Sequence, residues 1–469
     1  MPGPQNARDI DRDSDEEIED ILKELSSREE QQLLDILTQG GGCEQNEWLP
    51  TIAFQEEILE VARAHPHSRC AGIHQLFVLK GPVEPARLRA AWRNLQYRHD
   101  ALRTIFSEQG SQWRQRVTRM TSELVIRGAA IDERTMRETV GRHRVEGFDL
   151  AGGALARAEL VLGRENTHIL VLSWHHSVVD GYSLGVLWDD LCQAYNDPGD
   201  APLPTQQGEF AQQQSARRIV RAKEAALTIR SRYPKALDSP ADTRPRPHHV
   251  DLGGIMLRWG IVESGRLAAR AGEEGLTLYM VLLAAYRSAL EGKGLLSPDA
   301  PVWSPMSGRV SSCFSRSVGL FMNLVPVFGS IARAPEGERS IAALREGCIE
   351  AFDRQDVPRN DLIELLPELP AASALFVLQN SSTGTRDLAG VQRSMPTPSG
   401  FPPAAPILEF DSPVAGLFPT AFSIEFMEDN SLAGVFEYDR ARLDAATATE
   451  VTDCLSGMIG KVIAGTFRW

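Results

Sequence analysis

The segment that most constrains the fold is THILVLSWHHSVVDGYS, residues 167–183, where an apolar run leads into two histidines and an Asp-Gly pair. The run at 167–174 is apolar and β-branched, as expected of a buried strand. Imidazoles at the end of a buried strand are costly unless each has a partner or a task. The segment at 183–199 then predicts a helix that ends at a Pro-Gly stop. The sequence therefore predicts a strand, a short polar turn and a helix.

The polar residues of this turn indicate a general base on a braced loop. Histidine is the usual base at neutral pH, because its ordinary pKa is about 6.5. We assign this role to His176, at the start of the turn. Asp180 can tie down the loop through a salt bridge, and Gly181 permits a positive φ or the close approach of a ligand to the backbone. We expect His176 to be presented into a cleft.

Other interpretations of the histidine pair compete with this one. His175 and His176 could be core residues, and the chain has a second pair, His248 and His249, in a Pro-rich segment without an Asp-Gly. A metal site of His175, His176 and Asp180 is disfavoured, because adjacent residues of an extended chain point to opposite faces. We therefore predict no metal. No cysteine lies in a protease-like context, so a base without a protein nucleophile predicts direct transfer onto a nucleophile of the substrate.

Composition narrows the class of protein. Hydrophobic residues make up 42% and charged residues 24% of the 469, as in ordinary globular proteins. The net charge is −14, and residues 1–40 carry −8 of it (twelve acidic and four basic side chains), so nothing favours nucleic-acid binding. The apolar stretch at 278–286 is too short to span a membrane, and no secretory signal is present. The six cysteines are scattered without a Cys-x-x-Cys pair, which fits a cytoplasmic protein without structural zinc.

Periodicity predicts an α/β fold with mostly antiparallel strands. Expected strands lie at 73–82, 317–329 and 373–380, with hairpins at 155–174 (turn near 163–166) and 422–439. Expected helices lie at 84–106, 183–199, 276–291 and the C-terminus. The segment at 392–406 holds five prolines and is expected to lack regular structure.

Composition shifts predict three regions. Residues 1–43 form an acidic extension with two short helices, which is either a solvated linker or a docking element for a partner protein. Pro-rich stretches at 200–204 and 239–250 bracket a helix rich in Arg and Ala. We place a lobe boundary there, which gives an N-terminal lobe at 44–240 and a C-terminal lobe at 241–469.

Five motifs in order carry a resemblance to a known family. HHSVVDG matches the HHxxxDG signature of the chloramphenicol-acetyltransferase-like superfamily. The segments at 97–106, 307–327, 354–358 and 374–380 resemble the RHxxLRTxF, GR…xGxFxNxxP, (H/R)QDxP and FxxQN motifs of nonribosomal peptide synthetase condensation domains. The segment at 307–327 keeps Gly308, Arg309, Gly319, Phe321, Asn323 and Pro326. Two motifs depart: S-x-A-Q-x-x-x-W is only echoed at 52–59, and R-D-x-S is not recognisable.

The resemblance implies a pseudodimer of two acetyltransferase-like lobes in a V shape, with a central tunnel. In that family a carrier protein delivers an acyl thioester on its phosphopantetheine arm, and the acceptor enters from the other side. His176 would act as a general base or would position the nucleophile, with His175 as a support. Asp180 would pair with Arg309, and Gly181 would bring backbone close to the thioester. Asn323 would either line the tunnel or brace a loop.

The resemblance also implies partners. The chain shows no Gly-Gly-x-Ser carrier attachment site, so we expect a freestanding enzyme or an excised domain that meets its carrier protein in trans, as a monomer with no tightly bound cofactor. The acceptor would be an amine or an alcohol, free or carrier-bound, and the product an amide or an ester. One alternative is an epimerisation domain, although the segment at 318–326 resembles the condensation version. The other is a non-catalytic recruitment module, which usually loses the motif histidine or glycine.

Overall fold

The computed structural model describes residues 47–64, 71–110, 112–199, 202–238, 251–329, 332–333, 339–370, 373–379, 384–395, 418–427 and 429–466. The two helices predicted within residues 1–43 therefore lie outside the described residues. The helices are α2 (Ala53–Ala64), α3 (Pro85–Arg98), α4 (Glu133–Val145), α5 (Gly181–Asn196), α6 (Gln207–Arg232), α7 (Pro234–Leu237), α8 (Ile261–Glu273), α9 (Leu278–Gly292), α10 (Ala342–Asp353), α11 (Arg359–Leu365) and α12 (Ala445–Ile463). The strands are β1 (Leu49–Pro50), β2 (Gly72–Lys80), β3 (Thr104–Gln109), β4 (Gln112–Val117), β5 (Leu124–Gly128), β6 (Ala156–Leu162), β7 (Thr167–His175), β8 (Leu252–Trp259), β9 (Val302–Met306), β10 (Asn323–Val327), β11 (Ala332–Arg333), β12 (Arg339–Ser340), β13 (Leu375–Gln379), β14 (Gln392–Ser394), β15 (Thr420–Phe426) and β16 (Leu432–Asp439).

The N-terminal half is built on a sheet with the strand order β14-β2-β7-β6-β5. Strand β7 pairs antiparallel with β2 and β6, and its side chains alternate between two buried faces. Leu172 and Trp174 join the apolar cluster that includes residues of α3 and α5, whereas Ile169 and Val171 join the cluster that includes Val140 of α4. Strand β7 is thus buried on both faces, which explains its continuous apolar run.

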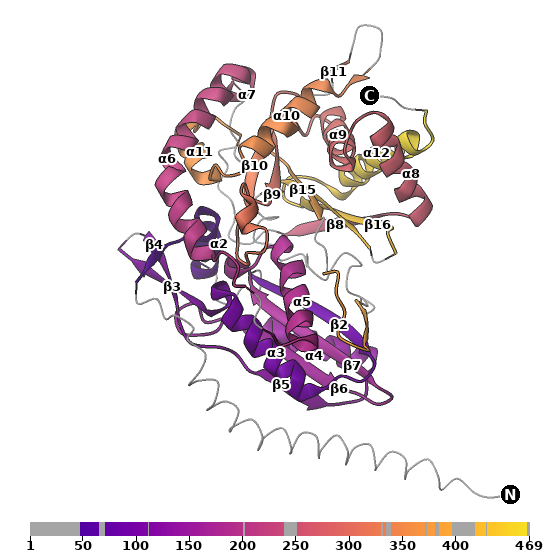
Figure 1. The fold of residues 1–469 in the computed structure, drawn as a ribbon. Helices are drawn as coiled ribbons and strands as arrows, with labels where there is room; N and C mark the ends of the chain where they lie inside the picture. The colour runs from indigo at the N-terminus through magenta and orange to yellow at the C-terminus, as the bar shows by residue number, and fades with distance from the viewer. Residues whose placement is uncertain are drawn as a thin grey trace, which may run out of the picture.

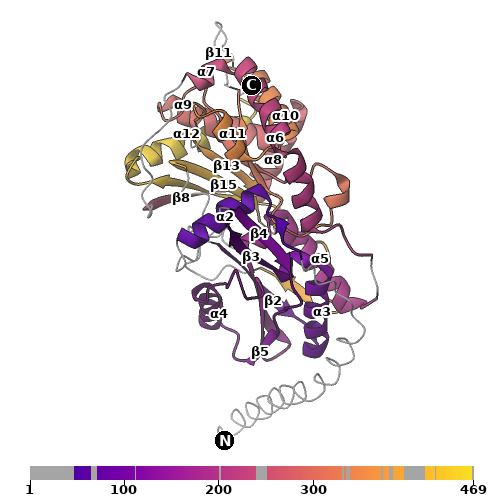
Figure 2. The same ribbon diagram turned by 90° about the vertical axis from the view of Figure 1, so that its left-hand side faces the viewer.

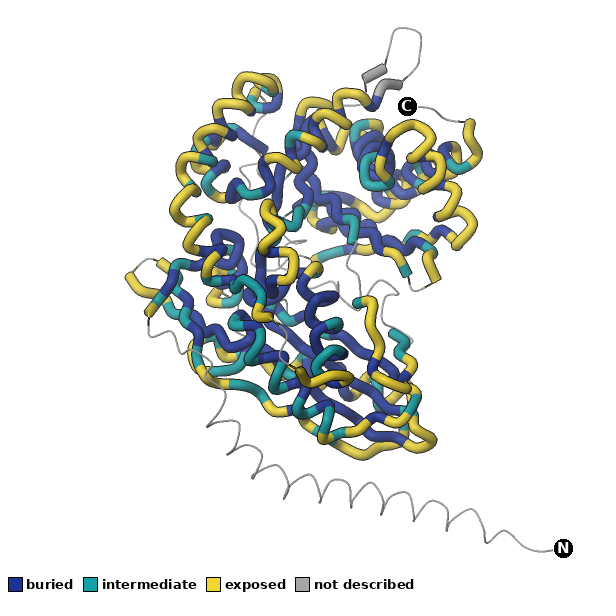
Figure 3. Tube along the Cα trace, in the orientation of Figure 1, coloured by how far each residue is buried: buried dark blue, intermediate teal, exposed yellow. Residues whose placement is uncertain are grey.

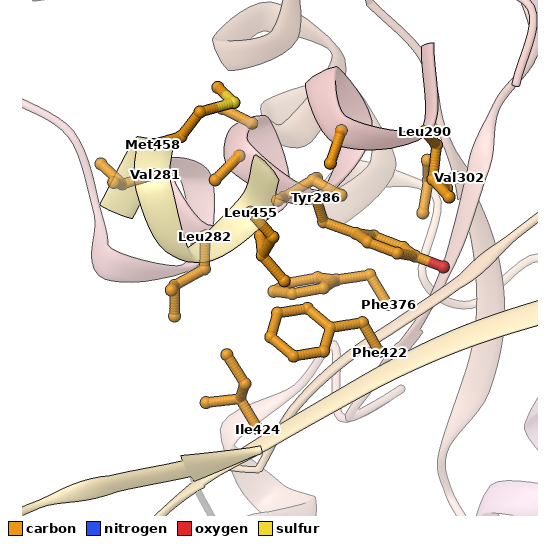
Figure 4. Close-up of a cluster of buried hydrophobic side chains, with 14 of the residues drawn as sticks. Val281, Leu282, Tyr286, Leu290, Val302, Phe376, Phe422, Ile424, Leu455 and Met458 are labelled. Atoms are coloured by element: carbon orange, nitrogen blue, oxygen red, sulfur yellow. The ribbon is translucent and has the colours of Figure 1, made fainter. Parts of the chain in front are cut away.

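The C-terminal half is built on a sheet with the strand order β10-β9-β13-β15-β16-β8. Strand β13 runs parallel to both β9 and β15, so the carboxyl ends of these three strands lie at one edge. Helices α8, α9 and α12 lie on one side of the sheet, and the N-terminal half lies on the other (Figures 1 and 2). Phe376, Phe422 and Ile424 point from the sheet into the apolar cluster with the helices (Figure 4).

The two halves are joined by packing as well as by the chain. Strand β14 follows the C-terminal strands in sequence but pairs with β2 of the N-terminal sheet. One buried cluster combines Phe54 of α2, Ala226 of α6 and Trp303 of β9. Buried positions fill both sheets, and exposed positions line the outer side of α6 (Figure 3). The lobe boundary at 240 remains a prediction, and β14 reaches across it.

The structure confirms the mixed α/β class and corrects three predicted elements. The helix expected over 84–106 ends at Arg98, because His99 adopts extended backbone angles and turns its side chain inward. A 3-10 turn, Asp100–Arg103, and β3 follow. The strand expected over 317–329 is limited to β10. The Pro-rich segment at 392–406 begins with β14, and its residues 396–406 lie outside the described residues.

The strand at 317–329 is shorter than expected because side chains occupy its backbone donors. The N–H groups of Gly319, Leu320 and Phe321 donate to Ser183, Gln207 and Asp180, respectively, at 3.1, 3.2 and 3.0 Å. These donors cannot also form a ladder with a neighbouring strand. The predicted strand therefore gives way to a loop bound to the N-terminal half.

Candidate active site

The motif folds as predicted into a strand, a short turn and a helix. His175 is the last residue of β7, and His176–Val178 form a 3-10 turn. Asp180 is the N-cap of α5, and its Oδ1 accepts a hydrogen bond from the Ser183 N–H at 2.9 Å. A capping carboxylate satisfies a helix donor that would otherwise be buried without a partner. The first task of Asp180 is thus to begin α5.

Asp180 also binds the second half of the chain. Nη1 of Arg309 lies 2.8 Å from Asp180 Oδ2, and Nη2 lies 3.1 Å from Oδ1. The backbone N–H groups of Phe321 and Met322 donate to Oδ2 at 3.0 and 3.2 Å. Burial acts to raise the pKa of Asp180, but Arg309 and the donors of Ser183 hold it below its ordinary value. The predicted pairing of Asp180 with Arg309 is confirmed.

Arg309 is enclosed by aromatic and polar groups. Its guanidinium lies 4.4 Å from the ring centroids of both Tyr182 and Phe321, a distance at which the cation and the ring attract each other. Nη2 also donates to Ser183 Oγ at 2.9 Å and to the Ser317 carbonyl at 3.1 Å. The side chains of Asp180 and Arg309 are only 2% and 4% exposed. The pair is therefore a fixed joint between the two halves.

His175 is buried in the structure. A hydrogen bond of 2.7 Å joins its Nδ1 to Ser177 Oγ. Its ring also meets the edge of Phe148, with the ring centroids 5.7 Å apart. Burial, with a smaller effect of His176, lowers the pKa of His175 to about 3. His175 is therefore neutral and occupied with local contacts.

His176 is half-buried and differs from His175 in its contacts. Its backbone N–H donates to the carbonyl of Ala71 at 2.7 Å, which fixes the turn to the residue before β2. Among the described residues, no hydrogen-bond partner meets its buried Nδ1. Burial lowers the pKa of His176 below its ordinary value, although Asp180 and nearby backbone carbonyls act to raise it. A neutral imidazole of this kind can accept a proton at neutral pH.

The structure changes one expectation for Gly181 and answers the question about Asn323. Gly181 is the first residue of α5 and is not among the glycines with a positive φ, so the close approach of a ligand remains the only predicted reason for glycine here. The Asn323 amide donates to the carbonyls of Gln355 and Val357. Asn323 thus braces the loop that carries the RQDVP motif.

Three further residues of the site were not singled out from the sequence. The Ser183 hydroxyl contacts both Asp180 and Arg309. Gln55 is buried and donates to the Ser177 carbonyl at 2.6 Å, and Gln355 accepts from the Gly308 N–H at 3.1 Å. Gln55 lies in the weak echo at 52–59 and Gln355 in the RQDVP motif, so both carried a signal. Ser183 carried none beyond its place in the first turn of a helix.

Two residues of the RHxxLRTxF motif, Arg98 and His99, form a second charged cluster with Asp190 of α5. His99 Nε2 and Arg98 Nε each lie 2.8 Å from Asp190 Oδ2. Arg316 binds Asp190 Oδ1. Burial acts to raise the pKa of Asp190, but His99 and the two arginines lower it to about 2. Asp190 therefore anchors both the end of α3 and Arg316 to α5.

The described residues hold neither a candidate metal site nor a membrane-spanning helix. No group of three or more His, Cys, Asp or Glu side chains in the described ranges could hold a metal ion. Across those same ranges, the helices are all too short or too polar to cross a membrane.

Known proteins resemble the chain in sequence and in structure. Gramicidin S synthase 2 of Brevibacillus brevis is 29% identical over 330 residues, which are 67% of this chain and 7% of that protein. Bacitracin synthase 2 of Bacillus licheniformis is 26% identical over 360 residues, 74% of this chain and 13% of that protein. The chain thus spans a small part of the length of these relatives.

Solved structures share the fold. SgcC5 from Streptomyces globisporus superposes with a TM-score of 0.68 at 22% identity, covering 88% of this chain and 98% of SgcC5. The X-domain solved with OxyB from teicoplanin biosynthesis gives a TM-score of 0.70 at 20% identity, covering 91% and 96%. The condensation domain family matches residues 45–467. The chain belongs to the condensation domain family of nonribosomal peptide synthetases.

Proposed function

We propose that this chain transfers an acyl group from the phosphopantetheine thioester of a carrier protein to an amine or alcohol acceptor. The observation that carries the proposal is His176, a neutral and half-buried imidazole on a turn that the Asp180–Arg309 pair fixes. The family membership supports the acyl-transfer class, because family members work within synthetases such as gramicidin S synthase 2 and bacitracin synthase 2. The product is an amide or an ester in nonribosomal peptide or hybrid natural-product biosynthesis.

The reaction requires one proton to move. The acceptor N–H or O–H attacks the thioester carbonyl carbon, and His176 accepts the proton. The tetrahedral intermediate then collapses, the carbon–sulfur bond breaks, and the phosphopantetheine thiolate takes the proton from His176. Alternatively, His176 positions the nucleophile and stabilises the intermediate. In both cases the imidazole must be neutral when the acceptor arrives, as the lowered pKa of His176 provides.

Other residues would serve this reaction indirectly. Gly181 would admit the thioester close to the backbone at the start of α5. His175 would hold the turn through Ser177. Asn323 would keep the Gln355–Val357 loop in place. Asp180 and Arg309 would set the turn and not exchange protons, because each already binds the other.

The partner would be a carrier protein that docks in trans, with the chain a monomer. In this proposal the acidic residues 1–43 form a docking element for that carrier. Deleting residues 1–40 should then weaken turnover with carrier-bound donor and spare turnover with small thioester mimics. Equal turnover of carrier-bound donor with and without residues 1–40 would reject the docking role.

A second candidate is a recruitment module. The X-domain that shares this fold was solved with a second protein, OxyB, so the fold also occurs in such a complex. His176 and Gly181 are both retained, which favours catalysis. An epimerisation domain is the remaining alternative, and it would change the donor stereochemistry without forming an acceptor product.

The test is mass spectrometry of a carrier-loaded acyl donor incubated with amines and alcohols. We expect the wild-type chain to form an acyl–acceptor product and His176→Ala to lose about 10²–10⁴ in rate. His249→Ala, from the histidine pair without an Asp-Gly, is the matched control and should keep full activity. Product formed at equal rates by wild type and His176→Ala would overturn the role of His176. An inverted donor without acceptor product would indicate epimerisation.

A further inference from the structure

Buried carboxylates fall into two groups in the described part of the chain. The six are Glu159, Asp180, Asp190, Glu425, Glu437 and Asp439. Four of them bind an arginine at 2.6–3.1 Å, through the pairs Glu159–Arg142, Asp180–Arg309, Asp190–Arg98 and Asp439–Arg442. No ion pair or hydrogen bond joins the side chain of Glu425 or Glu437 to another described residue. A buried carboxylate without a partner is costly, so these two need another explanation.

Both unpaired carboxylates lie on the same face of the C-terminal sheet. Phe422 and Ile424 of β15 point toward α9 and α12 (Figure 4). Because side chains alternate along a strand, Glu425 points to the opposite face. Glu437 is paired with Ala421 and shares that face. The face lies on the side of the sheet where the N-terminal half is found (Figures 1 and 2).

Glu425 lies at the edge of the sheet that leads to the candidate active site. Strands β9, β13 and β15 are parallel, so Met306, Gln379 and Phe426 end them at a common edge. The chain leaves β9 at this edge and reaches Arg309, which binds Asp180. Gln379 is the direct neighbour of Glu425 in the register, so an amide accompanies the carboxyl. Glu437 lies four residues away along the register, opposite Ala421.

Apolar residues on the same face belong to a cluster that also includes Ala71, the hydrogen-bond partner of the His176 backbone. Leu375 and Val377 of β13 precede Gln379 on this face, and they belong to the cluster that includes Ala71. The carbonyl of Ala71 accepts the hydrogen bond from the His176 backbone. A step of two residues along a strand covers about 7 Å. Glu425 therefore follows side chains of the same apolar cluster as Ala71, which binds the His176 backbone.

No neighbouring strand supplies a cation to Glu425. On its face β13 carries Leu375, Val377 and Gln379. The charged side chains of β16 on this face, Glu437 and Asp439, are both acidic. On β8, Arg258 shares this face but lies two strands away and is exposed. The Oε1 atom of Glu425 is buried without a partner among the described residues, and the residue is 8% exposed. Burial raises the pKa of Glu425 to about 8.

We propose that Glu425, together with Gln379, forms a subsite for a positively charged side chain, an ammonium or a guanidinium, on one of the two substrates. This inference rests on the proposed function, because it assigns the charged group to one of the two substrates of that reaction. The charged group of the substrate would pair with Glu425, as an arginine pairs with each of the four other buried carboxylates. Gln379 can accept a further hydrogen bond from the same group through its amide oxygen.

The charged group must be distinct from the nucleophile. An amine held as an ammonium by Glu425 has no lone pair with which to attack a thioester. The nucleophile at His176 is therefore a second group, and the cation is a specificity element elsewhere on the donor or the acceptor. The subsite sets substrate choice and not the chemical step.

The test compares lysine and norleucine probes, which differ by the terminal ammonium. Lysinamide and norleucinamide represent the acceptor, and the Nα-acetylated lysyl and norleucyl thioesters of N-acetylcysteamine represent the donor. Binding to the full-length His176→Ala chain is measured by calorimetry, so that turnover does not interfere. We expect the lysine probe of one arm to bind about tenfold or more tightly than its norleucine counterpart, as for a charge-assisted buried contact. The arm that shows this preference identifies the substrate.

Adding Glu425→Gln should reduce the lysine preference to about onefold. Glu437→Gln is the matched control, a buried carboxyl on the same face but at the other end, and should keep the preference. Thermal unfolding checks that both variants are folded. Equal binding of lysine and norleucine probes in both arms, or a preference that survives Glu425→Gln, would overturn the subsite. Binding and turnover are separate measurements. If the His176→Ala chain shows the lysine preference and the wild-type chain forms no product, only the proposed function is rejected.

Discussion

Two aspartates of α5 show how one kind of ion pair can serve two different ends. Asp180 and Asp190 are both buried, and each binds an arginine from the segment between β9 and β10, Arg309 or Arg316. Asp190 also binds the imidazole of His99, whereas Asp180 has no hydrogen bond to His176 among the described contacts. Asp190 thus occupies a ring nitrogen of His99, whereas Asp180 leaves the ring of His176 without a carboxylate partner.

This difference separates a structural motif from a candidate catalytic one. His99 is fully buried, and Asp190 occupies its Nε2. His176 is half-buried, and the nearby carboxylate is taken up by Arg309 and backbone donors. We therefore propose His176, and not His99, for the chemical step. Each has an aspartate nearby, but Asp190 binds the His99 ring, whereas Asp180 binds Arg309.

The largest expected effect is the loss of the Asp180 carboxylate. Asp180→Ala should lower the free energy of unfolding by about 3–5 kcal/mol, because it leaves Arg309 buried and uncompensated. Asp190→Ala should cost less, because Arg316 is 48% exposed and Arg98 is 20% exposed, so both can regain water. Urea unfolding of the two variants and the wild type measures the difference.

The double variant Asp180→Ala with Arg309→Met sharpens this comparison. Replacing both members of a buried pair with apolar groups is often nearly neutral, so the double variant should recover the part of the stability lost through the uncompensated Arg309. The loss from the backbone donors of Ser183, Phe321 and Met322 should remain. It also keeps the measurement possible if Asp180→Ala alone is insoluble. An Asp180→Ala chain as stable as the wild type would show that the pair does not hold the halves together.

Much of this comparison could be predicted from the sequence. The pairing of Asp180 with Arg309 followed from the motif resemblance, and the strand–turn–helix at His176 followed from local patterns. The end of α3 at Arg98 did not, because the helical pattern continues past His99 and only the distant Asp190 explains the break. The short β10 was missed for the same reason, since Asp180, Ser183 and Gln207 of the N-terminal half occupy its backbone donors.

The candidate site was predicted less completely than the fold. Ser183 is three residues from Asp180 in sequence, but its contact with Arg309 joins residues 126 positions apart. Glu425 carried no signal at all, since an acidic residue in a strand looks like an exposed one until the sheet is assembled. Such residues become visible only when the two faces of each strand are known.

The second prediction concerns acid stability, where Asp190 should dominate. Its pKa is lowered from 3.8 to about 2 by His99 and the arginines, against the opposing effect of burial. A carboxyl with a lower pKa in the folded than in the unfolded chain stabilises the fold above its unfolded pKa. That contribution, about 2–3 kcal/mol, is lost as the pH falls through the folded pKa.

Urea unfolding from pH 6 to pH 3 measures this loss. About 1 kcal/mol of the Asp190 contribution should disappear by pH 3, and Asp190→Asn should show a correspondingly flatter dependence below pH 4.5, a limit set roughly by the ordinary carboxyl range. Asp197→Asn, at the exposed C-terminal end of α5, is the matched control and should follow the wild type. Equal slopes for Asp190→Asn and the wild type would mean that the cluster does not hold Asp190 ionised.

The smallest expected effect is the loss of the Ser183 hydroxyl, which contacts both Asp180 and Arg309. Ser183→Ala removes a buried group that accepts hydrogen bonds from Arg309 Nη2 and from the Gly319 N–H. The Gly319 N–H is then left buried without an acceptor, whereas Nη2 keeps Asp180 and Ser317. Unfolding should therefore become easier by about 1–3 kcal/mol, less than for Asp180→Ala. Ser177→Ala is the matched control: this hydroxyl is also buried, but its one described side-chain partner is His175. A Ser183→Ala chain no less stable than Ser177→Ala would show that Asp180 and Arg309 hold the joint without the hydroxyl, as Asp190 and its arginines do.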